Sequence, residues 1–293
     1  MAQIRTDLAL EAKALWQERA GEMTRLEGVE ATESVREGFP CTLVHITSDR
    51  GAQALGMPVG RYVTLTMDGL LRREENAFSR GVTAIARELE SLMDDLPEDG
   101  PVLVVGLGNS AITPDAIGPR AHRYTLVTRH LVEGLPEQFG AFRPVSALAP
   151  GVLGTTGMES GQVVQAVCRE LRPVCVVAVD ALAARSVSRL CRTVQLADTG
   201  IAPGSGIGNC RAALNRETLG IPVLAVGVPT VVDCATLAAD LAPGAALSHS
   251  GDLLVTPKDI DSRVDDLSKV IGYGISMALQ PGLTVGDLDL LLT

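Results

Sequence analysis

The chain has 293 residues, of which 46% are hydrophobic, 20% are charged and only 3% are aromatic. This length and aliphatic composition predict a large core of the kind found where helices cover both faces of a parallel sheet. The net charge of -10 argues against a broad surface that binds the phosphates of nucleic acid. We therefore expect no direct contact with nucleic acid, although this charge is compatible with a protein substrate that itself binds DNA.

The sequence shows neither a signal peptide nor a membrane-spanning stretch. The N-terminus lacks the apolar core of a signal peptide, and no uninterrupted apolar stretch is long enough to span a membrane. The cysteines form no CxxC pair or zinc-finger spacing, which favours small buried hydrophobes in a reducing compartment; they are Cys41, Cys168, Cys175, Cys191, Cys210 and Cys234. We expect a cytoplasmic protein with no membrane partner.

The first part of the chain combines a polar extension with an antiparallel strand pair. Residues 1–30 are largely polar, with a short helical pattern, and are expected to form an N-terminal extension. Residues 41–47 and 61–66 alternate between apolar and polar side chains, which predicts two strands that pair antiparallel. Apolar residues then recur at helical spacing over 78–92, which predicts a helix that ends before Pro97.

The rest of the chain alternates between strand and helix patterns. Aliphatic runs predict strands at 102–105, 143–148, 174–179, 193–197 and 221–226. Amphipathic stretches predict helices at 121–133, 158–171, 231–241 and 259–279. This alternation predicts a three-layer α/β fold, in which helices cover both faces of a mostly parallel or mixed sheet with right-handed crossovers.

Two of the apolar runs end near an aspartate. Residues 102–105 lead into a glycine-containing loop and then Asp115, and residues 176–179 are followed directly by Asp180. If both runs are buried parallel strands, the aspartates lie at one edge of the sheet, where open α/β folds place their sites. Asp115 also suits a turn or a helix N-cap, whereas a carboxylate at the end of a buried strand is costly unless it is capped or functional. Two carboxylates at one edge indicate acid/base hydrolysis.

Glycine-rich loops raise the alternative of a nucleotide site. The loop after residues 102–105 departs from the dinucleotide motif G-x-G-x-x-G, because alanine occupies position 111. The glycines at 204–208 lack the lysine of a phosphate-binding loop, so a tight structural loop is the simpler interpretation. A non-catalytic nucleotide-binding protein stays open as an alternative function.

Nucleophile and metal motifs are not found in the sequence. No G-x-S-x-G or H-E-x-x-H sequence occurs. His122 and His130 are eight residues apart in one expected helix, two turns from each other, and so cannot share a metal. We expect no cofactor and no metal site, while a metal held between Asp115 and Asp180, as in a metal-dependent maturation endopeptidase, stays open as an alternative.

A series of motifs, in order along most of the chain, points to one family. They are residues 105–109, 113–119, 126–131, 142–147, 150–154, 180–186, 198–209, 217–222, 227–233 and 254–258. Through these motifs the chain resembles the spore germination proteases of endospore-forming bacteria. The resemblance implies a fold like that of hydrogenase maturation endopeptidases, and a homotetrameric endopeptidase of atypical aspartic type. It also implies cleavage of the small acid-soluble proteins that coat DNA in the spore core, with the proposed catalytic residues of the family falling on Asp115 and Asp180.

The same resemblance implies a zymogen that processes itself. Residues 6–11 resemble the processing and substrate sites of the family, in which an acidic residue precedes a bulky apolar residue and alanine. We predict a cut between Asp7 and Leu8, with residues 1–7 as propeptide and 8–293 as a single α/β protease domain. A simpler interpretation is that Thr6 and Asp7 cap the first helix. The chain departs from longer members of the family in two places: its propeptide is very short, and its segment 233–254 lacks an insertion that they carry. Any substrate-docking or tetramer contacts provided by that insertion are therefore left open for this chain.

The acidic residue before the cut requires a basic partner. Candidates are Arg120, Arg129, Arg143 and Arg185, of which Arg185 follows Asp180 most closely but would also pair with any nearby acid.

Two close carboxylates, such as those expected of Asp115 and Asp180, share one proton. The ionised member would take a proton from water, the protonated member would donate to the carbonyl oxygen or leaving amine, and glycine-loop N–H groups would stabilise the oxyanion.

Overall fold

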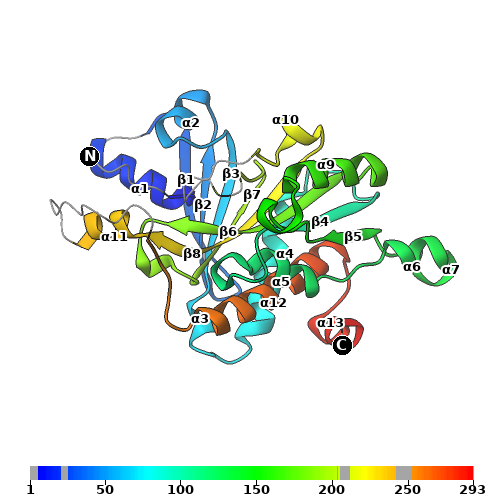
Figure 1. Ribbon diagram of the computed structural model, residues 1–293. Helices are drawn as coiled ribbons and strands as arrows, with labels where there is room; N and C mark the ends of the chain where they lie inside the picture. The colour runs from blue at the N-terminus through cyan, green and yellow to red at the C-terminus, as the bar shows by residue number, and fades with distance from the viewer. Residues whose placement is uncertain (1–5, 21–25, 203, 205–211, 242–252, 293) are drawn as a thin grey trace.

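One mixed sheet crosses the structure. The computed structural model describes residues 6–20, 26–202, 204, 212–241 and 253–292. Its strands are β1 (Val29–Arg36), β2 (Phe39–Ile46), β3 (Gly60–Thr66), β4 (Val102–Gly106), β5 (Val145–Leu148), β6 (Cys175–Ala184), β7 (Thr193–Ala197), β8 (Val223–Asp233) and β9 (Leu254–Val255). They form a nine-stranded sheet in the order β1-β2-β3-β7-β8-β6-β4-β5, with β9 against β8 (Figure 1).

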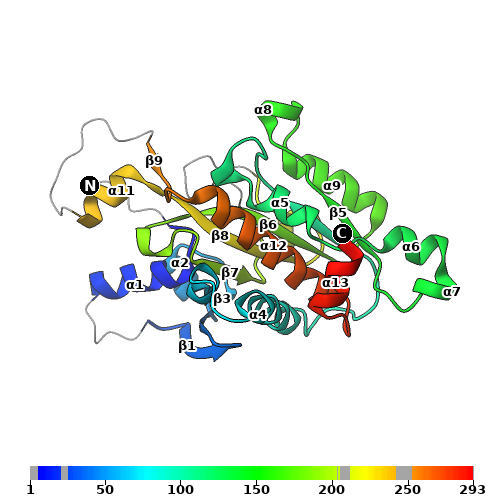
Figure 2. The same ribbon diagram turned by 90° about the horizontal axis from the view of Figure 1, so that it is seen from below.

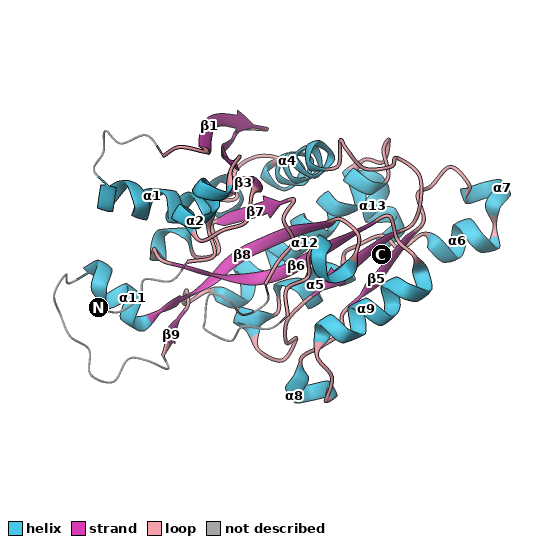
Figure 3. Cartoon of the chain, turned by 90° about the horizontal axis from the view of Figure 1, so that it is seen from above, coloured by secondary structure: helices cyan, strands magenta, loops and turns pink. Residues whose placement is uncertain are grey.

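Helices cover both faces of this sheet. They are α1 (Ala9–Ala20), α2 (Asp49–Leu55), α3 (Asp68–Leu71), α4 (Ala77–Leu92), α5 (Ile117–Arg123), α6 (Arg129–Gly134), α7 (Pro136–Phe139), α8 (Leu153–Thr156), α9 (Ser160–Leu171), α10 (Arg216–Leu219), α11 (Cys234–Leu241), α12 (Ile260–Leu279) and α13 (Val285–Leu292), with 3₁₀ turns η1 (Thr113–Asp115) and η2 (Val187–Arg189). Helices α4, α5 and α12 lie together on one face, as Figure 2 shows, and α9 lies on the other (Figure 3).

Alternating side chains explain the three layers. In β4, Val102 and Val104 belong to the core cluster beneath α4, α5 and α12. Leu103 and Val105 point to the opposite face, where they pack with Val164 of α9. Every residue of β4 is buried, which is the pattern of a strand covered on both faces. The predicted three-layer α/β fold is therefore confirmed.

The sheet combines a parallel half with an antiparallel half. Strands β5, β4, β6 and β8 are parallel neighbours, whereas β1, β2, β3, β7 and β8 pair antiparallel. The antiparallel pair predicted at 41–47 and 61–66 is β2 with β3. The parallel half places the carboxyl ends of β4 and β6 side by side, which positions the site.

Two predicted strands are confirmed but end later than expected, because tertiary pairing extends them. The strand predicted at 174–179 continues to Ala184, and the one predicted at 221–226 continues to Asp233, since β6 and β8 pair along both extensions. The helix expected from residue 231 accordingly begins at Cys234. Within the parallel half, only the central strands are lengthened in this way.

Two further corrections concern helices. The helix predicted at 121–133 is divided into α5 and α6, because the Thr128 N–H donates to the Val145 carbonyl of β5 and draws the chain toward the sheet. His122 and His130 thus lie in different helices. The expected N-terminal extension is also wrong for its described part, because Leu8 and Ala9 are fully buried and β1 joins the sheet.

Two further observations concern membrane crossing and the state of the cysteines. None of the helices in the described part of the chain is both long and apolar enough for a membrane crossing. Most of the described cysteines are buried, as predicted, and burial raises the pKa of Cys175 to about 11 and of Cys191 to about 12. Cys210 lies outside the described residues.

Candidate active site

The loop that carries Asp115 is held against the end of β4. The chain leaves β4 at Gly106 and reaches Asp115 in the turn η1. One carboxylate oxygen of Asp115, Oδ2, accepts a hydrogen bond of 2.8 Å from the Asn109 N–H. The hydroxyl of Thr230, in β8, donates to the Pro114 carbonyl at 2.6 Å. The loop is therefore tied to a neighbouring strand one residue before Asp115.

Two glycines allow this loop to pack closely. Gly108 has a φ of +113°, and a Cβ there would lie 2.1 Å from the carbonyl oxygen of Asp115. A Cβ at Gly118 would lie 2.2 Å from the carbonyl oxygen of Leu107 and 2.4 Å from that of Val179. No side chain is tolerated at these distances, so both glycines serve the contact between the Asp115 loop and the sheet. Close packing is therefore sufficient to explain these glycines, and a nucleotide-binding role is not needed to explain them.

Asp180 lies within β6, not at its end. Its register partner in β8 is Gly227, and its exposed fraction is 4%. Along β6, Ala178 packs beneath α9 and Leu182 packs against Leu8. Because residues two apart on a strand share a face, Asp180 points to this same face. The expected position at a strand end is corrected, and the buried carboxylate Oδ1 accepts a hydrogen bond of 2.9 Å from the following N–H.

The structure brings the two aspartates into one cavity. Strands β4 and β6 are parallel neighbours with Gly106 opposite Val179, so β4 ends where β6 reaches Asp180. Asp115 and Asp180 both line a cavity of about 410 Å³, and Asp7 lines it as well. The catalytic role of the two aspartates stays a prediction, but their side chains share the space that such a role requires.

The N-terminal segment is docked on β6 beside this cavity. The Asp7 N–H donates to the Ala183 carbonyl at 3.0 Å, and the Ala183 N–H donates to the Asp7 carboxylate at 2.9 Å. These contacts lie beyond the end of β4, where β6 no longer has β4 as a neighbour. Leu8 is fully buried among apolar residues that include Leu182 and Val232. The residues on both sides of the predicted cut are thus fixed to the sheet.

The first turn of α1 carries a buried carboxylate, that of Glu11. Glu11 is only 6% exposed, and it accepts hydrogen bonds from the N–H groups of Arg185 at 2.7 Å and Ser186 at 3.1 Å. The Thr6 hydroxyl donates to Glu11 at 2.5 Å and accepts from the Leu8 N–H at 3.1 Å. These contacts join the segment to the end of β6, and Thr6 and Asp7 therefore do more than shape the start of α1.

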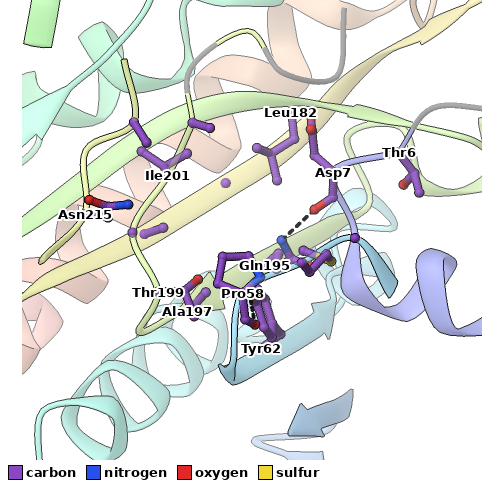
Figure 4. Close-up of a pocket in the computed structure, with 17 residues that line it drawn as sticks. Thr6, Asp7, Pro58, Tyr62, Leu182, Gln195, Ala197, Thr199, Ile201 and Asn215 are labelled. Atoms are coloured by element: carbon purple, nitrogen blue, oxygen red, sulfur yellow. Dashed lines mark hydrogen bonds between the residues drawn. The ribbon is translucent and has the colours of Figure 1, made fainter. Parts of the chain in front are cut away.

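A second cavity, of about 390 Å³, adjoins the first. Asp7 and Leu182 line both, so the N-terminal segment passes between the two cavities. Figure 4 shows the second cavity, with Gln195 bonded to Asp7 and Tyr62 beside it. Burial raises the pKa of Tyr62 to about 12, and its protonated hydroxyl donates to the Pro58 carbonyl at 2.8 Å.

The arginines proposed to bind an acidic substrate residue all have contacts within the chain. The Arg185 guanidinium donates to Glu18 of α1 at 3.0 Å. The other three contact acidic side chains or backbone carbonyls near them; they are Arg120, Arg129 and Arg143. The role of Arg185 toward a substrate stays a prediction.

In the part of the chain that the structure describes, histidines and other possible metal ligands are dispersed. Over the described ranges, no three histidine, cysteine, aspartate or glutamate side chains are grouped so that they would hold a metal ion. His122 is half-buried in α5, and this burial lowers its pKa. The glycines at 206 and 208 lie outside the described residues, so the tight loop expected at 204–208 stays a prediction.

Two polar residues of the site were not singled out from the sequence. Thr230 is fully buried and is the extra residue of a β-bulge, because Leu182 pairs with Pro229 and Ala183 pairs with Val231. The bulge directs Thr230 toward the Asp115 loop. Gln195 is 8% exposed and bonds the N-terminal segment. The available signal was a polar side chain within a buried aliphatic strand, which requires a partner.

A family model and curated relatives both relate the chain to germination proteases. A family model described as germination protease matches residues 9–251. The germination protease of Caldanaerobacter subterraneus subsp. tengcongensis is 42% identical, over 99% of this chain and 98% of its own length. That of Clostridium perfringens is 39% identical over 99% of each chain.

A relative and a solved structure extend the comparison. The germination protease of Priestia megaterium is 44% identical over 81% of this chain and 65% of its own length. The crystal structure of the [NiFe] hydrogenase maturation protease HycI from Thermococcus kodakarensis is 18% identical, with a TM-score of 0.35 over 64% of this chain and 98% of that one. The family model and the full-length relatives decide the assignment, and the chain belongs to the germination protease family, a family of peptidases that act in spore germination.

Proposed function

We propose that this chain cleaves small acid-soluble DNA-protecting proteins in the spore core during germination, by a two-aspartate mechanism. Asp115 and Asp180 form the catalytic pair. The observation that carries the proposal is the single cavity that these two carboxylates line together with Asp7. Membership of a peptidase family supplies the reaction class, and the acidic chain is compatible with a DNA-binding protein as substrate rather than with the DNA itself.

The proposed chemistry needs one proton shared by the pair. The ionised carboxylate takes a proton from a water molecule whose oxygen attacks the carbonyl carbon of the peptide bond. The protonated partner donates to the nitrogen of the leaving amine as the carbon–nitrogen bond breaks. Two neighbouring carboxylates favour such a singly protonated state, because both cannot be ionised at low cost.

The proposal includes self-processing between Asp7 and Leu8. Support comes from the docking of both residues on β6, with Asp7 in the cavity of the aspartate pair. While residues 1–7 stay attached, Asp7 occupies space that a protein substrate would need. Release of this propeptide then leaves residues 8–293 as the protease domain, which we propose to assemble as a homotetramer.

The test uses the purified full chain and a small acid-soluble spore protein. Fragment masses and the N-terminus of the enzyme are followed over time for the wild type, Asp115→Asn, Asp180→Asn and the control Asp266→Asn, whose aspartate is exposed on α12. We expect substrate cuts after an acidic residue and a new N-terminus at Leu8 for the wild type and the control. Both activities are expected to fall below detection in the two site variants.

The outcomes separate the parts of the proposal. Full activity of either site variant would refute the two-aspartate mechanism. Loss of wild-type activity with a chelator, restored by added metal, would favour a metal held between Asp115 and Asp180. A wild type that cuts the substrate but keeps its own N-terminus would refute the self-processing site alone. Gel filtration with light scattering tests the homotetramer.

A further inference from the structure

Gln195 connects two distant parts of the chain at the predicted cut. It lies in β7, where Val194 and Leu196 belong to the core beneath α4 and α12. The alternation of the strand therefore directs the Gln195 side chain to the other face, where the N-terminal segment crosses the sheet. Its exposed fraction is 8%, so its amide must find partners within the protein.

Both ends of this amide bond the N-terminal segment. The Nε2 group donates to the Asp7 carbonyl at 3.0 Å, as the dashed line in Figure 4 shows. The Oε1 atom accepts from the Ala9 N–H at 2.8 Å. A backbone carbonyl only accepts and a backbone N–H only donates, so these two partners determine the orientation of the amide. The two bonds bracket Leu8, and one of them reaches the carbonyl of the Asp7–Leu8 peptide bond.

We propose that Gln195 is a catalytic residue that holds and polarises the carbonyl of the peptide bond to be cut, first in self-processing and then in protein substrates. This inference rests on the proposed function. When water attacks the Asp7 carbonyl carbon, the carbonyl electron pair moves onto the oxygen, which becomes negatively charged. A donor already 3.0 Å from that oxygen stabilises the charge without further reorganisation.

The surrounding contacts hold the bond in place for this step. The Asp7 N–H is bonded to β6, and the Leu8 side chain is enclosed in an apolar pocket. The Asp7–Leu8 peptide bond is thus restrained on its N-terminal side by Asp7, on its C-terminal side by Leu8, and at its carbonyl oxygen by Gln195. As the oxyanion collapses, its electron pair re-forms the carbonyl, the bond to nitrogen breaks, and a proton from the aspartate pair completes the new amino group of Leu8.

The test compares two variants of Gln195 with one control. Gln195→Leu removes both hydrogen bonds, and Gln195→Glu, assayed at a pH at which the new carboxyl group is ionised, keeps an acceptor for the Ala9 N–H while it removes the donor. Thr193→Val is the matched control, because Thr193 is a buried polar residue of the same strand whose hydroxyl bonds the Arg189 carbonyl. The first-order rate of cutting at Asp7–Leu8 is measured by mass spectrometry in each full chain. Hydrogen exchange at the amides of Asp7 and Ala183 reports whether the segment stays docked.

We expect both Gln195 variants to slow the cut by about 10²–10³-fold, the effect of losing one donor to an oxyanion. Amide protection at Asp7 and Ala183 should persist in Gln195→Glu, and the control should stay within about 2-fold of the wild type. A Gln195→Glu chain cut at the wild-type rate would overturn the catalytic role, as would slowing accompanied by loss of amide protection. A wild type that is never cut at Asp7–Leu8 would instead refute the self-processing site. The Asp7 carbonyl that Gln195 contacts would then not belong to a bond that is cut, and this inference would fall with the site.

Discussion

Leu8→Ala tests how firmly the N-terminal segment is anchored. Leu8 is fully buried, in a cluster with Leu182, Ala184, Leu190 and Val232. Truncating a buried leucine to alanine costs about 2–5 kcal/mol, because apolar contact is lost and a cavity remains. The other anchors of the segment are hydrogen bonds, made by Asp7 with Ala183 and Gln195, by Ala9 with Gln195, and by the Glu11 carboxylate with the end of β6.

Local release of the segment is therefore the expected consequence. Since each 1.4 kcal/mol changes an equilibrium about tenfold, a loss of about 2–5 kcal/mol raises the open fraction by about 30-fold or more. Amide hydrogen exchange of the peptide that contains Ala183, whose N–H is bonded to Asp7, measures this opening. We expect faster exchange there and a smaller change in strands far from α1, such as β5.

The control for this experiment is Leu153→Ala. Leu153, in α8, is 47% exposed, so the same truncation should change stability by less than about 0.5 kcal/mol. If Leu8→Ala and Leu153→Ala exchange alike at Ala183, Leu8 is not the anchor of the segment. The inference that the predicted cut is held in place from its C-terminal side would then be refuted.

Three other substitutions give separate tests. Thr230→Val removes the hydrogen bond to the Pro114 carbonyl and should cost about 1–3 kcal/mol in unfolding free energy, with a further loss of protease activity; equal activity would show that the bulge does not position the Asp115 loop. Thr64→Val should raise the melting temperature, because Thr64 is 2% exposed and its buried hydroxyl has no hydrogen-bond partner within the described residues; a lower melting temperature would contradict this. Burial lowers the pKa of His122, so the unfolded chain binds the proton more readily and stability falls as the pH drops below the unfolded value of 6.5. In His122→Gln this loss of unfolding free energy, followed by urea denaturation at several pH values, should be smaller, and an unchanged slope would assign the effect to other groups.

The local patterns of the chain were enough to predict its fold class. Aliphatic runs such as 102–105 and 193–197 became β4 and β7, because such runs are stable only where both faces of a strand are covered. The helical spacing over 78–92 and 259–279 likewise matched α4 and α12. The order of strands and loops also predicted that Asp115 and Asp180 lie near each other, and they do because β4 ends where β6 reaches Asp180, although Asp180 lies within β6 and not at its end.

Only the tertiary structure decided how the site is completed. Nothing in the local sequence predicts that β6 continues past Asp180, because that extension depends on pairing with β8, whose partner residues lie much later in the chain, as in the pair Ala184 and Val232. Gln195 and Asp7 are separated by 188 positions, and their contact exists because α1 packs on the face to which β7 turns its glutamine. Side-chain type and spacing thus determined the layers and the two aspartates. The position of the N-terminal segment beside the cavity of the aspartates depended on long-range hydrogen bonds and apolar burial, which exist only once the sheet has formed.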